Sequence, residues 1–238
     1  MRTEQNRTEQ NRTEQNRTVG LITYNFPHLK TEQVIENLVG NYQSMKIYAL
    51  PFVPRKERVV LFHHRPNQTI SITPEVIAEK HNIDFTKCEN DLDIGDGCDV
   101  YLILGAGILS EKCVENKKII NAHPGIIPAC RGLDSFKWAI YNDIPIGNTL
   151  HYINKNVDSG EIISVIPTTV YKIDSLETLC RRHYENEIKM LSNFENYLKS
   201  PVNNFSDIQS DEPTMRMSTE IETKMVRMFD GYVEKWGQ

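Results

Sequence analysis

An uninterrupted apolar run, Asp99-Val-Tyr-Leu-Ile-Leu, constrains the fold more than any other feature of the sequence. Such a run is typical of a strand buried on both faces of a parallel sheet, because a strand with one solvent-facing side alternates apolar and polar residues. Helices must then cover both faces of the sheet, so strands and helices have to alternate along the chain. The run therefore predicts a layered α/β protein.

The remaining segments supply this alternation. Further strands are predicted at residues 19–24, 45–50, 118–122, 148–154 and 162–171. Helices are predicted at residues 32–39, 74–81, 135–141, 175–198 and 218–236, with a short one ending near residue 113. Thr73 is the expected N-cap before Pro74. We therefore expect an α/β, Rossmann-like doubly wound fold with a mostly parallel sheet and a short C-terminal helical appendage.

The composition changes twice along the chain, which divides it into three parts. Residues 2–18 repeat Arg-Thr-Glu-Gln-Asn three times before a final Arg-Thr and contain no apolar residue, so residues 1–18 are predicted to be a disordered tail. Residues 19–200 form the predicted main domain. Residues 201–238 are a predicted polar linker followed by an amphipathic helix, which either packs on its own domain or forms a dimer contact.

The net charge, the lengths of the apolar runs and the spacing of cysteines and histidines exclude several classes of partner. A net charge of −5 disfavours nucleic acid, which requires a basic face. No apolar run reaches the ~18 residues of a membrane span, and the N-terminus has no hydrophobic signal region. The five cysteines are odd in number and include no Cys-x-x-Cys, and the seven histidines include no His-x-x-x-His. We therefore expect a cytoplasmic protein with free thiols, no metal, no nucleic acid and no membrane partner.

Three side chains form a candidate catalytic set. Asn121 and His123 lie two residues apart at the end of a predicted strand, so they point to the same face, and Pro124 favours extended backbone at His123. Asp158 lies in a Val-Asp-Ser-Gly turn from which a carboxylate can reach back. An amide and an imidazolium can stabilise the oxyanion of an acyl transfer to an amine. A carboxylate beside the imidazolium orients it and can take the proton lost by the amine.

Other motifs leave alternatives open. Gly105-Ala-Gly107 follows a buried strand, but Ser110 stands where a dinucleotide-binding motif has its third glycine. Cys130 could be a nucleophile, although a lone cysteine is more often structural. The loop at residues 51–66 is either solvated or a phosphate-contacting surface, since it carries six basic or histidine side chains: Arg55, Lys56, Arg58, His63, His64 and Arg65.

Several motifs, dense over residues 99–170, carry a resemblance to a known family: Asn121-Ala-His123-Pro124-Gly, Pro128-x-x-Arg131-Gly132, Trp138-Ala-Ile, Gly147-x-Thr149-x-His151 and Asp158-x-Gly160-x-Ile. They resemble the folate-dependent formyltransferase family, which includes glycinamide ribonucleotide, methionyl-tRNA and sugar N-formyltransferases. The resemblance implies direct transfer of a formyl group from 10-formyl-tetrahydrofolate to an amine. By it, Asn121 and His123 would hold the formyl oxygen and Asp158 would tune His123 and shuttle the proton.

The resemblance also implies a place for the folate. The pterin would lie between the loop around Val157-Asp158 and the backbone of five residues, Leu104, Gly105, Ala106, Gly107 and Ile108. Thr149 and His151 match the family's supporting strand. A homodimer would be usual for the sugar enzymes that the chain resembles.

Elimination among the family's members suggests the acceptor. The glycinamide ribonucleotide enzymes have a Gly- and Ser-Asn-containing phosphate loop after the first strand, where this chain has Tyr24-Asn25-Phe26-Pro27-His28. The methionyl-tRNA enzymes have an extra C-terminal barrel, and the formyl-tetrahydrofolate hydrolases an N-terminal regulatory domain. A nucleotide-linked amino-dideoxy sugar therefore remains as the expected partner, with these substrate-binding candidates: Tyr24, Asn25, Arg55, Lys56 and Arg131. The alternatives are glycinamide ribonucleotide formyl transfer and a non-catalytic folate- or nucleotide-binding module.

Overall fold

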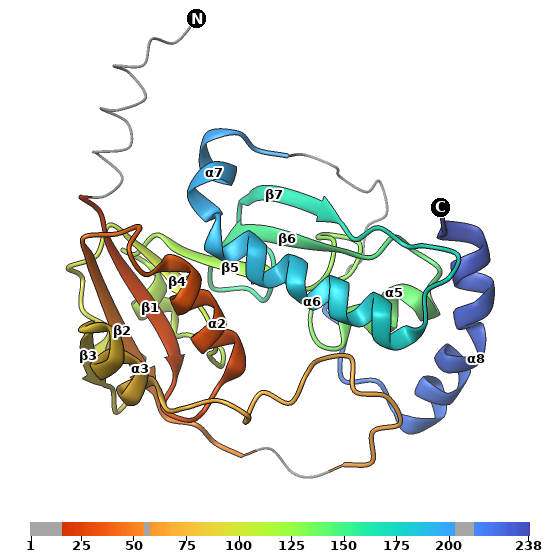
Figure 1. Cartoon of the computed structure of the whole chain (residues 1–238), viewed down its shortest axis with the longest axis horizontal. Coiled ribbons are helices and arrows are strands. Elements are labelled where there is room, and N and C mark those ends of the chain that lie inside the picture. The colour runs from red at the N-terminus through yellow and green to blue at the C-terminus, as the bar shows by residue number, and fades with distance from the viewer. Residues whose placement is uncertain (1–15, 55–57, 203–211) are drawn as a thin grey trace, which may run out of the picture. The chain divides into compact units, whose positions relative to one another are not determined.

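The computed structural model describes residues 16–54, 58–202 and 212–238 (Figure 1). Its strands are β1 (Thr18–Tyr24), β2 (Ser44–Leu50), β3 (Asp84–Lys87), β4 (Val100–Ile103), β5 (Ile119–His123), β6 (Gly147–Tyr152) and β7 (Ile162–Pro167). They form a seven-stranded sheet in the order β3-β2-β1-β4-β5-β6-β7. Strands β1 to β5 pair in parallel, whereas β6 and β7 pair antiparallel. The predicted α/β, mostly parallel sheet is confirmed.

The helices are α2 (Leu29–Leu38), α3 (Pro74–His81), α4 (Glu111–Val114), α5 (Ser135–Tyr141), α6 (Leu176–Ser192), α7 (Phe194–Lys199) and α8 (Thr219–Trp236), with a 3-10 turn η1 (Asp91–Asp93). Helices α3 and α5 have the predicted bounds, and Thr73 caps α3 as expected by accepting from the Val76 N–H. The single helix predicted at residues 175–198 was wrong. Asn193, at φ −116° and ψ 24°, interrupts it and separates α6 from α7.

The chain divides into two compact units. The first comprises the described residues up to 53 together with residues 68–120, and the second comprises the described residues of 54–67 and 121–238. Residues 1–15 of the predicted tail and residues 203–211 of the predicted linker lie outside the described residues, as do Arg55 and Lys56. Within the described ranges, each helix is too short or too polar to cross a membrane.

The first unit is built on the central strands β1, β2 and β4. Six side chains of β1, β2 and α2 are fully excluded from solvent: Leu21, Ile22, Ile47, Val34, Ile35 and Leu38. Gly20 on β1 lies against the ring of Tyr101, where a Cβ would come within 2.3 Å of the ring. This close approach requires glycine, because a larger residue would force β1 and β4 apart.

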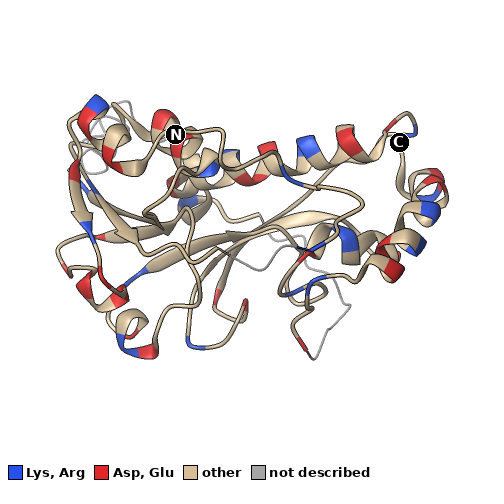
Figure 2. Cartoon of the chain, turned by 90° about the horizontal axis from the view of Figure 1, so that it is seen from below, with Lys and Arg blue, Asp and Glu red and all other residues tan. Residues whose placement is uncertain are grey.

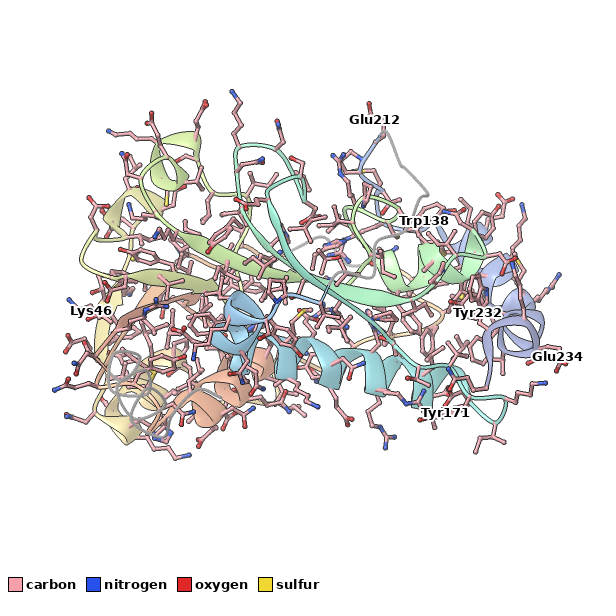
Figure 3. All side chains as sticks on the ribbon, turned by 90° about the horizontal axis from the view of Figure 1, so that it is seen from above. Lys46, Trp138, Tyr171, Glu212, Tyr232 and Glu234 are labelled. Atoms are coloured by element: carbon pink, nitrogen blue, oxygen red, sulfur yellow. The ribbon has the colours of Figure 1, made fainter. Side chains whose placement is uncertain are left out.

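The second unit packs α5, α6 and α8 into one apolar cluster beside β6 and β7 (Figure 1). Met225, Phe229 and Tyr232 form the buried face of α8, and the hydroxyl of Tyr232, labelled in Figure 3, donates to the Ile144 carbonyl at 2.9 Å. Of the two interpretations of this helix, packing on its own unit therefore accounts for its apolar stripe. The homodimer stays a prediction.

Basic residues of the loop between β2 and α3 are used inside the second unit. Arg58 pairs with Asp134 at 3.0 Å and donates to the Met217 carbonyl at 2.6 Å. Arg65 pairs at 2.6 Å with Glu187, whose side chain is 1% exposed. These two charges neutralise carboxylates of the second unit, an arrangement that neither predicted interpretation of the loop included, and contact with a phosphate stays a prediction.

The same loop meets a second buried charge. Lys137 on α5 forms an ion pair with Glu222 on α8, and both side chains are at most 1% exposed. Glu222 also accepts from the backbone N–H groups of Leu61 and Phe62 at 3.0 and 3.3 Å. Along the rest of the ribbon, Lys and Arg are interspersed with Asp and Glu (Figure 2).

Candidate active site

The candidate site of the second unit begins at the end of β5. Asn121 and His123 lie on the same face of this strand because side chains alternate along extended backbone. Asn121 is half-buried, whereas His123 is 3% exposed. Asp158 comes from the loop between β6 and β7, and its Oδ2 lies 3.2 Å from His123 Nδ1. The structure therefore brings together all three residues of the predicted catalytic set.

Each ring nitrogen of His123 faces acceptor atoms. Nδ1 meets the Asp158 carboxylate, and Nε2 lies 2.9 Å from the Cys130 carbonyl and 3.1 Å from Ser135 Oγ. Ser135 Oγ donates its own hydrogen to the Gly132 carbonyl at 3.1 Å, so it can only accept from the ring. An imidazolium, which donates from both nitrogens, satisfies all of these partners. The geometry thus accommodates an imidazolium next to Asp158.

Asp158 is held by its backbone and by one main-chain donor. Its φ of 46° lies in the left-handed region, which Asp and Asn adopt more readily than other non-glycine residues. Oδ2 accepts from the Gly132 N–H at 2.9 Å as well as contacting His123. Oδ1 makes no such contact and lies 3.7 Å from His151 Nε2. One carboxylate oxygen is therefore fixed for structure, and the other points toward the remaining site residues.

His151 on β6 supports Asn121. Its Nδ1 donates to the Tyr152 carbonyl at 2.9 Å, and its Nε2 accepts from Asn121 Nδ2 at 3.3 Å. Burial, and then the charge of His123, lowers the pKa of His151 to about 4 against the opposing effect of Asp158. The ring is therefore neutral at physiological pH, and its lone pair orients the Asn121 amide. The resemblance to the formyltransferases implied a supporting role for β6. The hydrogen bond between His151 and Asn121 is a physical basis for that role.

Thr149, also on β6, fixes the chain just beyond His123. Its hydroxyl donates to the Gly125 carbonyl at 2.7 Å and accepts from the Ile127 N–H at 3.0 Å. A Cβ on Gly125 would lie 2.4 Å from the Cys130 carbonyl and 2.7 Å from His123 Nε2. Only glycine leaves room for the bond between Cys130 and His123, which explains the glycine of the Asn-Ala-His-Pro-Gly segment.

Of the residues near His123, Ser135 was missed from the sequence, and Cys130 was left with two alternatives. Ser135, 1% exposed at the start of α5, was not singled out, because a lone serine at a helix start carries no catalytic pattern. Cys130 was considered as a nucleophile, but burial raises the pKa of its thiol to about 11 and the thiol donates to the Ser135 carbonyl at 3.3 Å. A protonated thiol is a poor nucleophile. Cys130 instead contacts His123 Nε2 through its carbonyl oxygen.

Arg131 lies in the same loop as Cys130 and Gly132. Its carbonyl accepts from the N–H and hydroxyl of Thr214 at 2.8 and 2.7 Å. Its Nε is buried and has no hydrogen-bond acceptor within the described residues. A buried donor of this kind needs an acceptor, such as an anionic ligand or water. Arg131 therefore keeps its place among the candidate substrate contacts.

The predicted folate contacts lie in separate units. In the first unit, the loop at residues 104–108 follows β4, with the N–H groups of Leu104 and Gly105 directed at the Ile22 carbonyl at 2.9 and 3.2 Å. Leu104 is buried, whereas Ile108 is 84% exposed. Val157 is 38% exposed and belongs to the second unit. Their contact with folate stays a prediction.

Gly105 has a structural reason to be glycine. A Cβ at this position would lie 2.9 Å from both Tyr24 and His28, whose rings approach the backbone there. The predicted substrate candidates Tyr24 and Asn25 end β1 in the same unit, and Asn25 donates its N–H to the Leu50 carbonyl at 2.6 Å. Glycine is thus explained here without a bound dinucleotide. Within the described residues, no group of three or more His, Cys, Asp or Glu side chains could hold a metal ion.

Comparison with known proteins finds a family match over part of the chain. Residues 99–194 match the family described as formyl transferase, a segment that includes all three residues of the catalytic set. A phosphoribosylglycinamide formyltransferase from Haemophilus influenzae is 32% identical over 114 residues, which make up 42% of this chain and 54% of the relative. The match thus spans about half of that relative's length.

Solved structures with low identity share the fold. A 4-N formyltransferase from Francisella tularensis has a TM-score of 0.55 at 16% identity, over 88% of this chain and 86% of that one. A phosphoribosylglycinamide formyltransferase from Anaplasma phagocytophilum has a TM-score of 0.56 at 21% identity, over 77% of this chain and 86% of that one. Residues 99–194 thus match the formyl transferase family, and the chain shares the fold of these formyltransferase structures.

Proposed function

We propose that this protein transfers the formyl group of 10-formyl-tetrahydrofolate, the formyl donor of its family, to the amine of a nucleotide-linked amino-dideoxy sugar. The observation that carries the proposal is the pairing of His123 with Asp158, whose carboxylate lies 3.2 Å from the imidazole, on the same strand end as Asn121. The folate supplies an activated formyl carbon, and the residues of this chain supply charge stabilisation and proton acceptance.

Asn121 and His123 divide the stabilisation of negative charge on the formyl oxygen. The Asn121 amide has two hydrogens, of which His151 takes one, and the second is the proposed donor to the formyl oxygen. Both N–H groups of His123 are already paired within the protein. We therefore assign to His123 the electrostatic field of a fixed imidazolium, rather than a direct hydrogen bond in this conformation.

Asp158 has a separate role for each carboxylate oxygen. Oδ2 is held by the Gly132 N–H and by His123, which keeps the side chain in place. Oδ1 is the proposed acceptor for the proton that the attacking amine loses. A positioned base of this kind contributes about 10²- to 10⁴-fold to the rate.

The loop after β1 favours a sugar nucleotide over glycinamide ribonucleotide as the acceptor. A phosphate loop needs backbone N–H groups that point to the ligand. Here the N–H of Asn25 is bonded to the Leu50 carbonyl, and the N–H of Leu29 is bonded to the Gln68 carbonyl at 2.8 Å. Pro27 between them has no N–H. Glycinamide ribonucleotide remains the second candidate, because the relative from Haemophilus influenzae acts in that class by its name.

The test is tetrahydrofolate release with 10-formyl-tetrahydrofolate and a panel of amines. The panel contains amino-dideoxy sugars linked to thymidine, uridine or guanosine diphosphate, together with glycinamide ribonucleotide. The proposal predicts turnover with one class of nucleotide sugar. Turnover with glycinamide ribonucleotide alone would assign the chain to the second candidate. Folate binding with no turnover on any amine would favour a non-catalytic module.

A further inference from the structure

The first unit exposes a compact group of aromatic rings. Phe26 and Phe52 are stacked, with ring centroids 4.5 Å apart and an interplanar angle of 21°. Tyr24 meets Phe52 edge to face at 5.3 Å. Phe26 and Phe52 are each 37% exposed, so neither is part of the core of the unit. We call Tyr24, Phe26 and Phe52 the aromatic platform.

The sheet fixes where the platform lies. Strands β1 and β2 run parallel in register, with Tyr24 opposite Leu50 at their carboxyl ends. The hydrogen bond from the Asn25 N–H to the Leu50 carbonyl ties the two following loops together and brings Phe26 near Phe52. Strand β1 has β2 on one side and β4 on the other, so the chain order reverses beside it. In open α/β sheets this is the edge at which ligands bind.

The chemistry of the platform suits a flat ring rather than a phosphate. The two N–H groups that flank the loop are taken by carbonyls, and Pro27 supplies none. Two stacked phenyl rings instead present aromatic surface, on which a nucleobase can stack without base-specific hydrogen bonds. Glycinamide ribonucleotide has no nucleobase, so a stacking surface would serve it little.

We propose that the aromatic platform binds the nucleobase of the acceptor substrate by stacking. This inference rests on the proposed function, since it assigns a place to one part of the proposed sugar nucleotide. It also explains why the first strand is followed by aromatic residues in place of a glycine-containing loop. Folate carries flat rings too, so the experiment includes a folate arm.

The experiment measures ligand binding to the full chain by isothermal titration calorimetry. The probes are thymidine, uridine and guanosine diphosphates, with inorganic pyrophosphate as a probe that lacks a base. The variants are Phe26→Leu and Phe52→Leu, which keep apolar bulk but remove a ring. Phe26→Tyr keeps a flat ring, and Leu92→Ala is a control at another exposed apolar position of the same unit.

The inference predicts that at least one nucleoside diphosphate binds the unaltered protein more tightly than pyrophosphate does. Each leucine variant should bind that diphosphate about 5- to 150-fold more weakly, the range expected for one lost stacking contact. Pyrophosphate binding should not change, and the tyrosine and Leu92 variants should bind as the unaltered protein does. The KM for 10-formyl-tetrahydrofolate should also be unchanged in both leucine variants.

Other outcomes separate the two proposals. The inference about the platform is wrong if no nucleoside diphosphate binds better than pyrophosphate, or if the leucine variants bind the diphosphate as tightly as the unaltered protein does. This holds even if the protein formylates a nucleotide sugar. If the leucine variants lose folate affinity instead, the rings hold the donor and the inference fails. If the variants lose diphosphate binding but only glycinamide ribonucleotide is formylated, the rings do stack on a nucleobase, but both the proposed function and the assignment of these rings to the acceptor fail.

Discussion

Replacing Asp158 by Asn tests the catalytic set by removing one charge while keeping the shape of the side chain. The left-handed backbone at φ 46° tolerates Asn as it does Asp. An amide oxygen in the place of Oδ2 can still accept from the Gly132 N–H and from His123. The amide nitrogen would take the place of Oδ1, 3.7 Å from His151 Nε2 and beyond hydrogen-bond distance, so the bond from Asn121 to His151 is kept. The local geometry should therefore survive the substitution.

The electrostatic loss can be estimated from the structure. Unit charges 3.2 Å apart, the distance between His123 Nδ1 and Asp158 Oδ2, attract by about 5 kcal/mol at an effective dielectric constant of ~20. Without the carboxylate the imidazolium loses this support, and the amine loses its proton acceptor. Removal of a positioned base costs about 10²- to 10⁴-fold in rate, or about 3–5 kcal/mol of transition-state stabilisation. We expect kcat to fall within this range.

The assay is formyl transfer under saturating substrates, paired with thermal unfolding. Asp143→Asn is the matched control, because Asp143 also has a left-handed backbone, at φ 54°, but binds Lys235 and Trp236 on the surface. The control should keep its kcat. Asp158→Ala should lower the unfolding temperature more than Asp158→Asn, since it leaves the Gly132 N–H without its acceptor. A kcat for Asp158→Asn within tenfold of the unaltered protein would refute the assigned role, and equal losses in both Asn variants would make the effect structural.

Three further predictions concern the second unit. Burial lowers the pKa of His183 to about 4, so below pH 6.5 the unfolded chain binds a proton that the folded chain does not. Stability should therefore fall as pH decreases, by about 2 kcal/mol for this residue between pH 8 and pH 5, and His183→Gln should lose that part of the slope in urea unfolding. Lys137→Met leaves the buried Glu222 carboxylate unpaired and should cost about 3–5 kcal/mol in urea unfolding, whereas adding Glu222→Gln should recover part of the loss. Thr149→Val removes the acceptor of the Ile127 N–H and should lower stability by about 1–3 kcal/mol together with kcat, while Thr149→Ser should keep both near their original values.

Local signals made some elements predictable. Helix α3 follows from Thr73 and Pro74, which specify an N-cap and a first helical position, and β4 follows from its continuous apolar run. Strand β3 was missed because the edge segment Asp84–Lys87 is largely polar and exposed. The break at Asn193 was missed because apolar residues continue on both sides of it, so periodicity alone does not end the helix.

The candidate site was predictable where side chains form a motif, as Asn121, His123 and Asp158 do. It was not predictable where the partner is a main-chain carbonyl, such as that of Cys130, or a lone hydroxyl, such as that of Ser135. The buried ion pairs could not be predicted for a different reason. The partners Arg65 and Glu187 are 122 residues apart, and no local sequence pattern connects them. Charge runs near a predicted loop therefore suggested a ligand surface where the fold uses the charges internally.

The most direct test of the central claim follows the formyl carbon itself. The protein is mixed with 10-formyl-tetrahydrofolate that carries an isotopic label in the formyl group and with the nucleotide-linked amino sugar that turns over in the panel. Mass spectrometry then locates the label. Direct transfer predicts that the label appears in the amide of the sugar, in equal amount to the tetrahydrofolate released, and that none remains on the protein. Label recovered as formate, or bound to the protein, would contradict this account of the site.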